Sequence, residues 1–226
     1  MIRSSACVQA MAAAECLLRG GLLICPTATF YALGCLPSHR QALAALCVLK
    51  ERASTKPLPL ACADCEQLLP LVCAEELRAL EESCPALFSF WPGPLTLLLP
   101  ARTDRFFDPC LVNGRRELAV RVSAHPLVRF LSRMCASLLT VSSANLKGRP
   151  PVTDSADLDK DLLSALDACP ARFAILPHAG SDAPKGTLPS TIIRPLRARD
   201  GSVVCELIRP GALLASQLTA AGLTLV

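Results

Sequence analysis

Residues 138–150 read LLTVSSANLKGRP, and this stretch decides the fold. The β-prone run LLTV predicts a short buried strand, and the polar run SSAN predicts a turn at the end of that strand. Polar side chains at strand ends of an α/β sheet lie where ligands usually bind. The stretch therefore favours an α/β protein with a site at its strand ends. A Ser/Asn turn that only satisfies local backbone groups would give the same pattern.

Outward from this stretch, short β-prone runs alternate with helical patterns along the whole chain. Strands are predicted at 22–25, 57–62, 95–99, 117–122, 138–142, 172–176, 190–194 and 203–208, and helices near 5–19, 39–51, 125–135 and 155–167. Ser38 and Gln41 have the spacing of a capping box before the second helix. Because no repeat or long linker divides the chain, we expect one α/β domain with a mixed sheet flanked by helices, whose last strands are partly antiparallel.

Composition excludes several classes of protein. Of the 226 residues, 52% are hydrophobic and 19% charged, which excludes a disordered chain. The net charge of +4 favours anionic ligands but falls short of a strongly basic nucleic-acid binder. Apolar runs such as LTLLL at 95–99 are far shorter than a membrane-spanning helix, and charges at Arg3, Glu15 and Arg19 interrupt any signal peptide. The sequence predicts a cytoplasmic protein.

The thirteen cysteines predict reduced thiols rather than disulfides. Their number is odd, and they are scattered through segments that are expected to form the core. Cys62 and Cys65 form a CxxC pair with Cys73 and Cys84 downstream, but no second CxxC and no suitably spaced histidine follow. We therefore predict no metal site.

A basic cluster lies at the end of the predicted helix 39–51 and in the loop after it: Lys50, Arg52 and Lys56. Cations here would complement the helix macrodipole, a contribution of about 0.3–1 kcal/mol each, or would bind phosphate. Familiar nucleotide and hydrolase motifs are absent. GSDAPKGT at 180–187 has Lys and Gly inverted relative to a Walker A loop, and there is no GxGxxG, HExxH or GxSxG.

Lys50 and Arg52 together with Ser143 and Asn145 resemble the KxR and SxN motifs of the threonylcarbamoyl-AMP synthase family, which has a YrdC-like domain. Further stretches of the resemblance follow in family order: CPTATFYALG at 25–34, KPL at 56–58, WPGPLT at 91–96, AVRV at 119–122, PST at 189–191 and RPG at 209–211. The resemblance implies a YrdC-like domain over 5–211, with an open twisted mixed sheet and a concave basic face. Residues 212–226 would form a tail with a short helix.

The resemblance also implies an activity, that of a nucleotidyltransferase. L-threonine and bicarbonate would give N-carboxy-threonine, which attacks the α-phosphate of ATP and releases pyrophosphate. The product, L-threonylcarbamoyladenylate, would serve threonylcarbamoyladenosine modification of tRNAs that decode ANN codons. Mg²⁺ is expected with ATP. A downstream threonylcarbamoyl transferase complex is an expected partner, and tRNA or double-stranded RNA a possible one. Alternatives are a non-catalytic RNA-binding module and a carbamoyl-adenylate-forming relative.

The same resemblance assigns the site residues. Lys50 and Arg52 would act in catalysis, Arg52 by holding phosphate and Lys50 by neutralising charge in the transition state. The residues expected to bind ATP are Lys50, Arg52, Lys56, Ser143, Asn145 and Arg209, and those expected to bind threonine are Thr29, Arg121 and Ser190. Arg121 could instead form a structural salt bridge, and Thr29, Ser190 and Arg209 could be ordinary turn residues.

Three positions depart from the family pattern. Ala53 stands where proline commonly follows the KxR arginine, and Lys147 replaces a serine after the SxN motif. Ala61 occupies a place where some members carry a histidine near threonine, which puts that contact in doubt.

Overall fold

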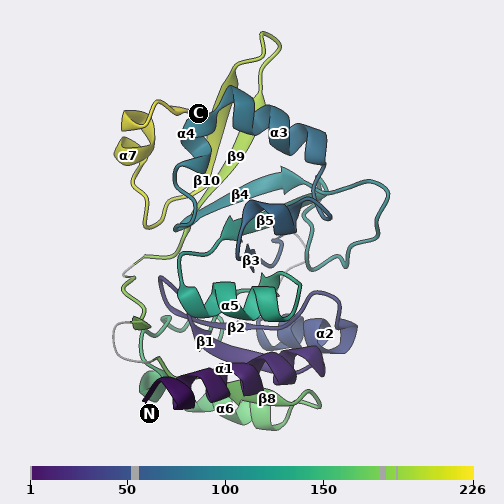
Figure 1. The fold of residues 1–226 in the computed structure, drawn as a ribbon, viewed down its shortest axis with the longest axis vertical. Helices are drawn as coiled ribbons and strands as arrows, with labels where there is room; N and C mark the ends of the chain where they lie inside the picture. The colour runs from purple at the N-terminus through teal and green to yellow at the C-terminus, as the bar shows by residue number, and fades with distance from the viewer. Residues whose placement is uncertain (1, 52–55, 179–181, 187) are drawn as a thin grey trace.

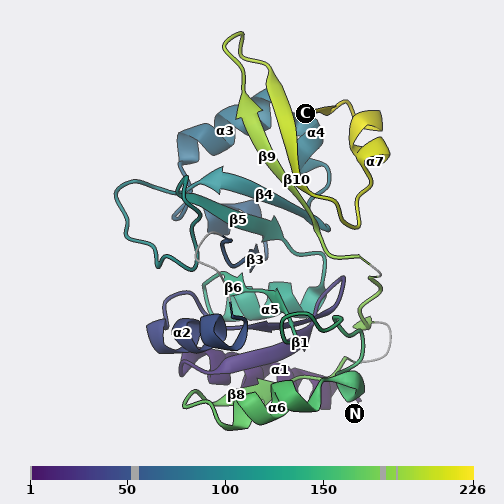
Figure 2. The ribbon, with the colours of Figure 1, turned by 180° about the vertical axis from the view of Figure 1, so that it is seen from behind.

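Two mixed β-sheets form the framework of the protein in a computed structural model that describes residues 2–51, 56–178, 182–186 and 188–226 (Figures 1 and 2). The smaller sheet has the order β7-β2-β1-β8, with β1 Leu22–Pro26, β2 Tyr31–Gly34, β7 Ser142–Ser143 and β8 Phe173–Ile175. The larger has the order β11-β10-β9-β4-β5-β3-β6, with β3 Leu60–Cys62, β4 Leu95–Pro100, β5 Glu117–Val122, β6 Leu139–Thr140, β9 Thr191–Arg197, β10 Val203–Arg209 and β11 Thr224–Leu225. The predicted mixed α/β fold is confirmed, but it has two sheets rather than one.

The stretch 138–143 joins the two sheets. Residues 138–142 were predicted as one strand, but β6 pairs with β3 of the larger sheet, whereas β7 pairs with β2 of the smaller one. Thr140 fixes the crossing: its Oγ1 accepts from the backbone N–H of Cys35 at 2.8 Å, and its own N–H donates to the Cys35 carbonyl at 3.0 Å. At the adjacent Gly34, a Cβ atom would lie 1.8 Å from the Thr140 carbonyl oxygen, so only glycine permits this approach.

Helices cover both sheets (Figures 1 and 2). They are α1 Ile2–Leu18, α2 Arg40–Leu49, α3 Ala74–Ser83, α4 Pro85–Phe88, α5 Pro126–Met134, α6 Lys160–Asp167 and α7 Ala215–Ala220, with 3₁₀ turns at Cys65–Leu68 and Ser155–Asp157. The four predicted helices are present. The one expected at 155–167 is interrupted, because Asp159 caps α6 by accepting from the N–H of Asp161. None of the described helices is long and apolar enough to span a bilayer.

Some local predictions were wrong. The capping box does not form, because α2 begins after His39, whose side chain makes no capping hydrogen bond, rather than after Ser38. Strands β2 and β11 and helices α3 and α4 were not predicted. Helix α7 lies in the C-terminal segment for which a short helix was expected, and β9 and β10 pair antiparallel as predicted.

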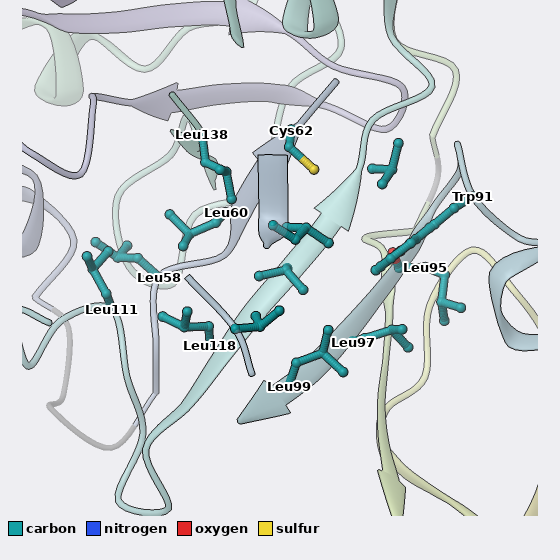
Figure 3. Close-up of a cluster of buried hydrophobic side chains, with 14 of the residues drawn as sticks. Leu58, Leu60, Cys62, Trp91, Leu95, Leu97, Leu99, Leu111, Leu118 and Leu138 are labelled. Atoms are coloured by element: carbon teal, nitrogen blue, oxygen red, sulfur yellow. The ribbon is translucent and has the colours of Figure 1, made fainter. Parts of the chain in front are cut away.

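The core is aliphatic, as the composition indicated. Figure 3 shows leucines of β3, β4 and β5 facing one another, with Trp91 at one end of the cluster. Trp91 packs edge-to-face on Phe88, and its indole N–H donates to the Leu95 carbonyl at 2.7 Å, so it is a core residue. The described cysteines form no disulfide, and no group of three or more His, Cys, Asp or Glu among the described residues is placed to hold a metal ion.

Candidate active site

A polar cavity of about 140 Å³ lies where the two sheets meet. The loop after β1, strand β2 and strand β7 line it from the smaller sheet, and β5, the residues before β9 and the end of β10 line it from the larger. The lining residues are Thr27, Thr29, Phe30, Tyr31, Ala32, Pro59, Arg121, Val141, Ser142, Ser143, Pro189, Ser190 and Arg209. All three residues predicted to bind threonine are therefore together, with two of those predicted to bind ATP.

Arg121 is a buried cation at the wall of this cavity. Its side chain comes from the middle of β5, only 6% of the residue is exposed, and its buried Nε has no hydrogen-bond partner among the described residues. Burial, reinforced by the positive charge of Arg209, lowers the pKa of Arg121 to about 10. No carboxylate of the described chain pairs with it, so the structural salt bridge considered above does not form there. A buried guanidinium in this state calls for an anionic ligand.

Arg209 and Ser190 are locked together beside Arg121. The Nη2 of Arg209 donates to the Ser190 carbonyl at 2.6 Å and to Ser190 Oγ at 3.1 Å. Ser190 Oγ also lies 2.9 Å from Oγ1 of Thr96, a buried residue of β4. Gly211 packs against this segment so closely that a Cβ would lie 2.4 Å from the Pro189 carbonyl oxygen. Ser190 therefore has a fixed position and is more than a loose turn residue.

Thr29 lies in a tight turn after β1 that Thr27 organises. Thr27 Oγ1 donates to the Phe30 carbonyl at 2.7 Å and accepts from the Thr29 N–H at 3.3 Å. The segment before β9 pairs with this turn, since the N–H of Gly186 donates to the Thr29 carbonyl at 2.9 Å. Part of GSDAPKGT thus packs on the turn, and the Asp182 carbonyl oxygen lies 2.8 Å from Nε2 of His125, the residue before α5.

Lys50 connects the two motifs that were predicted to bind ATP. Its Nζ donates to the Ser143 carbonyl at 2.9 Å, to the Asn145 carbonyl, and to Asn145 Oδ1 at 3.1 Å. Ser143 Oγ donates to Asn145 Oδ1 at 2.5 Å. The end of α2 and the turn after β7 are therefore adjacent, although 93 residues separate Lys50 from Ser143 in the chain.

Comparison with known proteins shows the family of the chain. The family model Sua5_yciO_yrdC, described as "Telomere recombination", matches residues 15–211. The chain belongs to this family. It is 36% identical over 155 residues to threonylcarbamoyl-AMP synthase of Idiomarina loihiensis, covering 69% of this chain and 81% of that protein. The corresponding protein of Serratia proteamaculans is 38% identical over 141 residues, covering 62% and 72%.

Solved structures of the Sua5/YciO/YrdC family share the fold. The structure of H234A/Y235A Sua5 of P. abyssi superposes with a TM-score of 0.75 at 26% identity, over 96% of this chain and 61% of that one. Sua5 of P. abyssi complexed with L-threonine gives a TM-score of 0.73 at 25% identity, over 96% and 58%. The chain thus spans about three fifths of these Sua5 chains.

The other residues predicted to belong to the site lie outside the cavity or outside the described residues. Arg52 and Ala53 lie outside the described residues, and Lys56 is described but does not line the cavity. Lys147, which departs from the family pattern, forms an ion pair: its Nζ lies 3.5 Å from a carboxylate oxygen of Glu51, which compensates its positive charge. Sequence reasoning missed Thr27, which lines the cavity, and Thr96, which contacts Ser190 behind it. Both stand within motifs of the family resemblance, CPTAT and WPGPLT.

Proposed function

We propose that this protein is an L-threonylcarbamoyladenylate synthase, using L-threonine, bicarbonate and ATP. The observation that carries the proposal is Arg121, a buried guanidinium without a carboxylate partner among the described residues, at the wall of a small hydroxyl-lined cavity. The cavity, at about 140 Å³, is smaller than the roughly 300–1,000 Å³ of pockets that bury drug-sized ligands. It suits the amino acid, while the nucleotide would extend towards Lys50.

Three of the residues that line the cavity would hold threonine. The carboxylate would pair with Arg121, whose planar fork matches the two carboxylate oxygens. Thr29 and Ser190 offer hydroxyl groups, and the turn and the Arg209 contacts fix their positions. Threonine bound this way would direct its carbamate towards the ends of β7 and β10, where Ser143 and Arg209 line the cavity.

The chemical step would place negative charge on the phosphates that the predicted cations are expected to contact. A carbamate oxygen of N-carboxy-threonine attacks the α-phosphorus of ATP, the new P–O bond forms, and the bond to the β-phosphate breaks, releasing pyrophosphate. Charge builds on the phosphoryl oxygens, so fixed cations accelerate the step. We assign this role to Lys50 and Arg52, with Lys56 and Arg209 supporting the phosphates and Ser143 and Asn145 orienting the nucleotide.

Mg²⁺ would enter with ATP, since the described residues that line the cavity include no carboxylate to hold the ion. Its chemistry would be to neutralise the triphosphate. We further propose a cytoplasmic location, with the labile adenylate consumed by a threonylcarbamoyl transferase complex that acts on tRNA.

Pyrophosphate release from ATP tests the proposal. Purified protein with Mg²⁺ should release pyrophosphate only when both threonine and bicarbonate are present, and less with serine or glycine. Lys50→Ala should lower kcat at least about 100-fold, as expected when one group that stabilises the transition state is lost. Arg78→Gln, which removes an exposed cation on α3, is the control and should leave release unchanged.

Three outcomes would overturn the proposal. Release that needs neither threonine nor bicarbonate would indicate a different ATPase. Release with carbamoyl phosphate in place of these substrates would favour a carbamoyl-adenylate former. No release, combined with tight binding of double-stranded RNA, would favour a non-catalytic module.

A further inference from the structure

Thr96 is the one polar residue of β4, a strand that reads LTLLLP and whose first five residues are buried. Only 1% of Thr96 is exposed. Valine has a similar shape and is at least as favourable in a strand, whereas a buried hydroxyl group costs free energy unless it is hydrogen-bonded. The fold alone would therefore favour valine here, and the hydroxyl group of Thr96 needs another explanation.

The neighbouring buried threonine, Thr191 of β9, shows what a structural hydroxyl group does. Its Oγ1 donates to the Leu213 carbonyl at 2.8 Å and accepts from the Leu213 N–H at 2.9 Å, so it holds the backbone. Among the described residues, Thr96 Oγ1 has one hydrogen-bond partner, Ser190 Oγ, at 2.9 Å. The hydroxyl group of Thr96 therefore holds a side chain that lines the candidate active site.

The pairing of β4 with β9 sets this contact. The two strands are parallel, with Thr96 opposite Ile192, and the N–H of Thr191 donates to the Pro94 carbonyl at 3.0 Å. Ser190, the residue before β9, lines the cavity, whereas Thr96 does not. Thr96 thus lies behind Ser190, one residue away from a ligand in the cavity.

The direction of the hydrogen bond between the two hydroxyl groups follows from their other partners. A serine hydroxyl group has one proton and two acceptor lone pairs, and Arg209 can only donate, so Ser190 Oγ accepts from Arg209 Nη2 at 3.1 Å. If Ser190 donated to Thr96, the Thr96 proton would be buried without an acceptor among the described residues, which is costly. Donation from Thr96 to Ser190 avoids this cost. It fills both lone pairs of Ser190 and leaves the Ser190 proton for a group in the cavity.

We propose that Thr96 is a positioning residue that makes Ser190 a hydrogen-bond donor to an anionic group of the substrate. Arg121 and Arg209, which line the same cavity, favour an anion, and an anion accepts hydrogen bonds. That this anion is the carboxylate of threonine rests on the proposed function. Because both lone pairs of Ser190 are filled, its oxygen cannot also accept from an ammonium or amide group. Thr96 would therefore act on substrate affinity and not on the transfer step.

Calorimetric titration with L-threonine tests the proposal, with KM and kcat measured by pyrophosphate release. Thr96→Val should raise Kd and KM for threonine about 2- to 10-fold, the worth of one hydrogen bond, and should leave kcat unchanged. Thr96→Ser keeps the hydroxyl group and should retain the Kd of the unchanged protein. Thr103→Val is the matched control, because Thr103 is exposed in the loop after β4 and does not line the cavity.

A purely structural role for Thr96 would rank the two variants in the opposite order. Valine fills the volume of threonine, whereas serine leaves a void of about one methyl group in the core. Urea denaturation should therefore find Thr96→Ser less stable than Thr96→Val. Affinity for threonine should follow the reverse order, since it depends on the hydroxyl group.

A double variant tests whether Thr96 acts through Ser190. In a Ser190→Ala background, Thr96→Val should change Kd no further, because the hydroxyl group that it positions is gone. The proposal is overturned if the two effects add, if Thr96→Val binds threonine as well as Thr103→Val does, or if Thr96→Ser binds as weakly as Thr96→Val. Unchanged protein that binds threonine but releases no pyrophosphate would refute the proposed synthase function alone. Protein that binds no threonine would overturn both.

Discussion

At the scale of single residues, two arginines of the described chain are in opposite situations: Arg194 is half-buried and Arg121 is buried. Arg194 is 2.9 Å from Glu117 and 2.7 Å from Glu206, so its charge is compensated. Arg121 has no carboxylate partner within the described chain, and burial depresses its pKa. Arg194 therefore stabilises the fold. The uncompensated charge of Arg121 lowers the free energy of unfolding in the absence of ligand.

Substitution of each arginine by methionine should therefore change stability in opposite directions. We expect Arg121→Met to raise the free energy of unfolding by about 1 kcal/mol or more, because a buried uncompensated charge disappears. Arg194→Met should lower it by about 3–5 kcal/mol, since Glu117 is left buried without its cation. Urea denaturation without ligand measures both. If Arg121→Met destabilised as much as Arg194→Met, Arg121 would be a structural residue, and the ligand site would lose its main support.

At the scale of elements, the passage from β6 to β7 is the step on which the fold depends. Gly34→Ala places a Cβ 1.8 Å from the Thr140 carbonyl oxygen. Because this oxygen belongs to the backbone, it cannot relieve the clash by a change of side-chain rotamer. We expect a loss of about 2–3 kcal/mol of unfolding free energy from this overpacking. Gly114→Ala is the control, because no heavy atom lies within 4 Å of its added Cβ and the change should be close to neutral. Equal urea midpoints for the two variants would contradict the tight crossing.

The same crossing shows what the sequence could and could not predict among the elements. Apolar runs such as 95–99 and 117–122 were correctly assigned to strands, because burial on both faces leaves a continuous β-prone pattern. The run 138–142 has the same pattern, but it changes sheets at Val141, whose N–H donates to the Pro59 carbonyl. The change of sheet depends on a contact with Gly34, which is far away in the chain. The local hydrophobic periodicity of residues 138–142 therefore cannot predict it.

The sequence predicted which residues lie together in the cavity better than it predicted how the strands divide between the two sheets. Ordered motifs indicated Thr29, Arg121, Ser190 and Arg209, and these four residues line one cavity. These residues stand within short motifs that the family resemblance matches in order, so residue identity was informative. The lack of a counter-charge for Arg121 was not predictable, because it depends on which carboxylates the fold brings near β5.

At the scale of the whole molecule, buried thiols link stability to alkaline pH. Burial raises the pKa of Cys25 and Cys62 to about 12 and that of Cys35 and Cys205 to about 11, from an ordinary value of 9.0. Between pH 9 and 11 the unfolded chain loses protons from these thiols while the folded chain keeps them. The stabilisation is therefore complete below pH 9 and is lost as the pH rises through 11 to 12. Arg121, with its lowered pKa, acts in the opposite direction above pH 10.

We therefore expect the free energy of unfolding to fall as the pH rises above 9.5, with each thiol whose pKa is raised by burial contributing at most about 1.4 kcal/mol per pH unit. Urea denaturation at pH 8, 9.5 and 10.5 under reductant measures the slope, and the reductant prevents disulfides that would mask it. Cys25→Ala should make the slope shallower by about 1.4 kcal/mol per unit, since one titrating thiol is removed while the others remain. Cys7→Ala, at an exposed thiol, should leave it unchanged. A stability that stays constant from pH 8 to 10.5 would mean that these thiols titrate equally in the folded and unfolded chains, which is incompatible with their burial in the two core clusters.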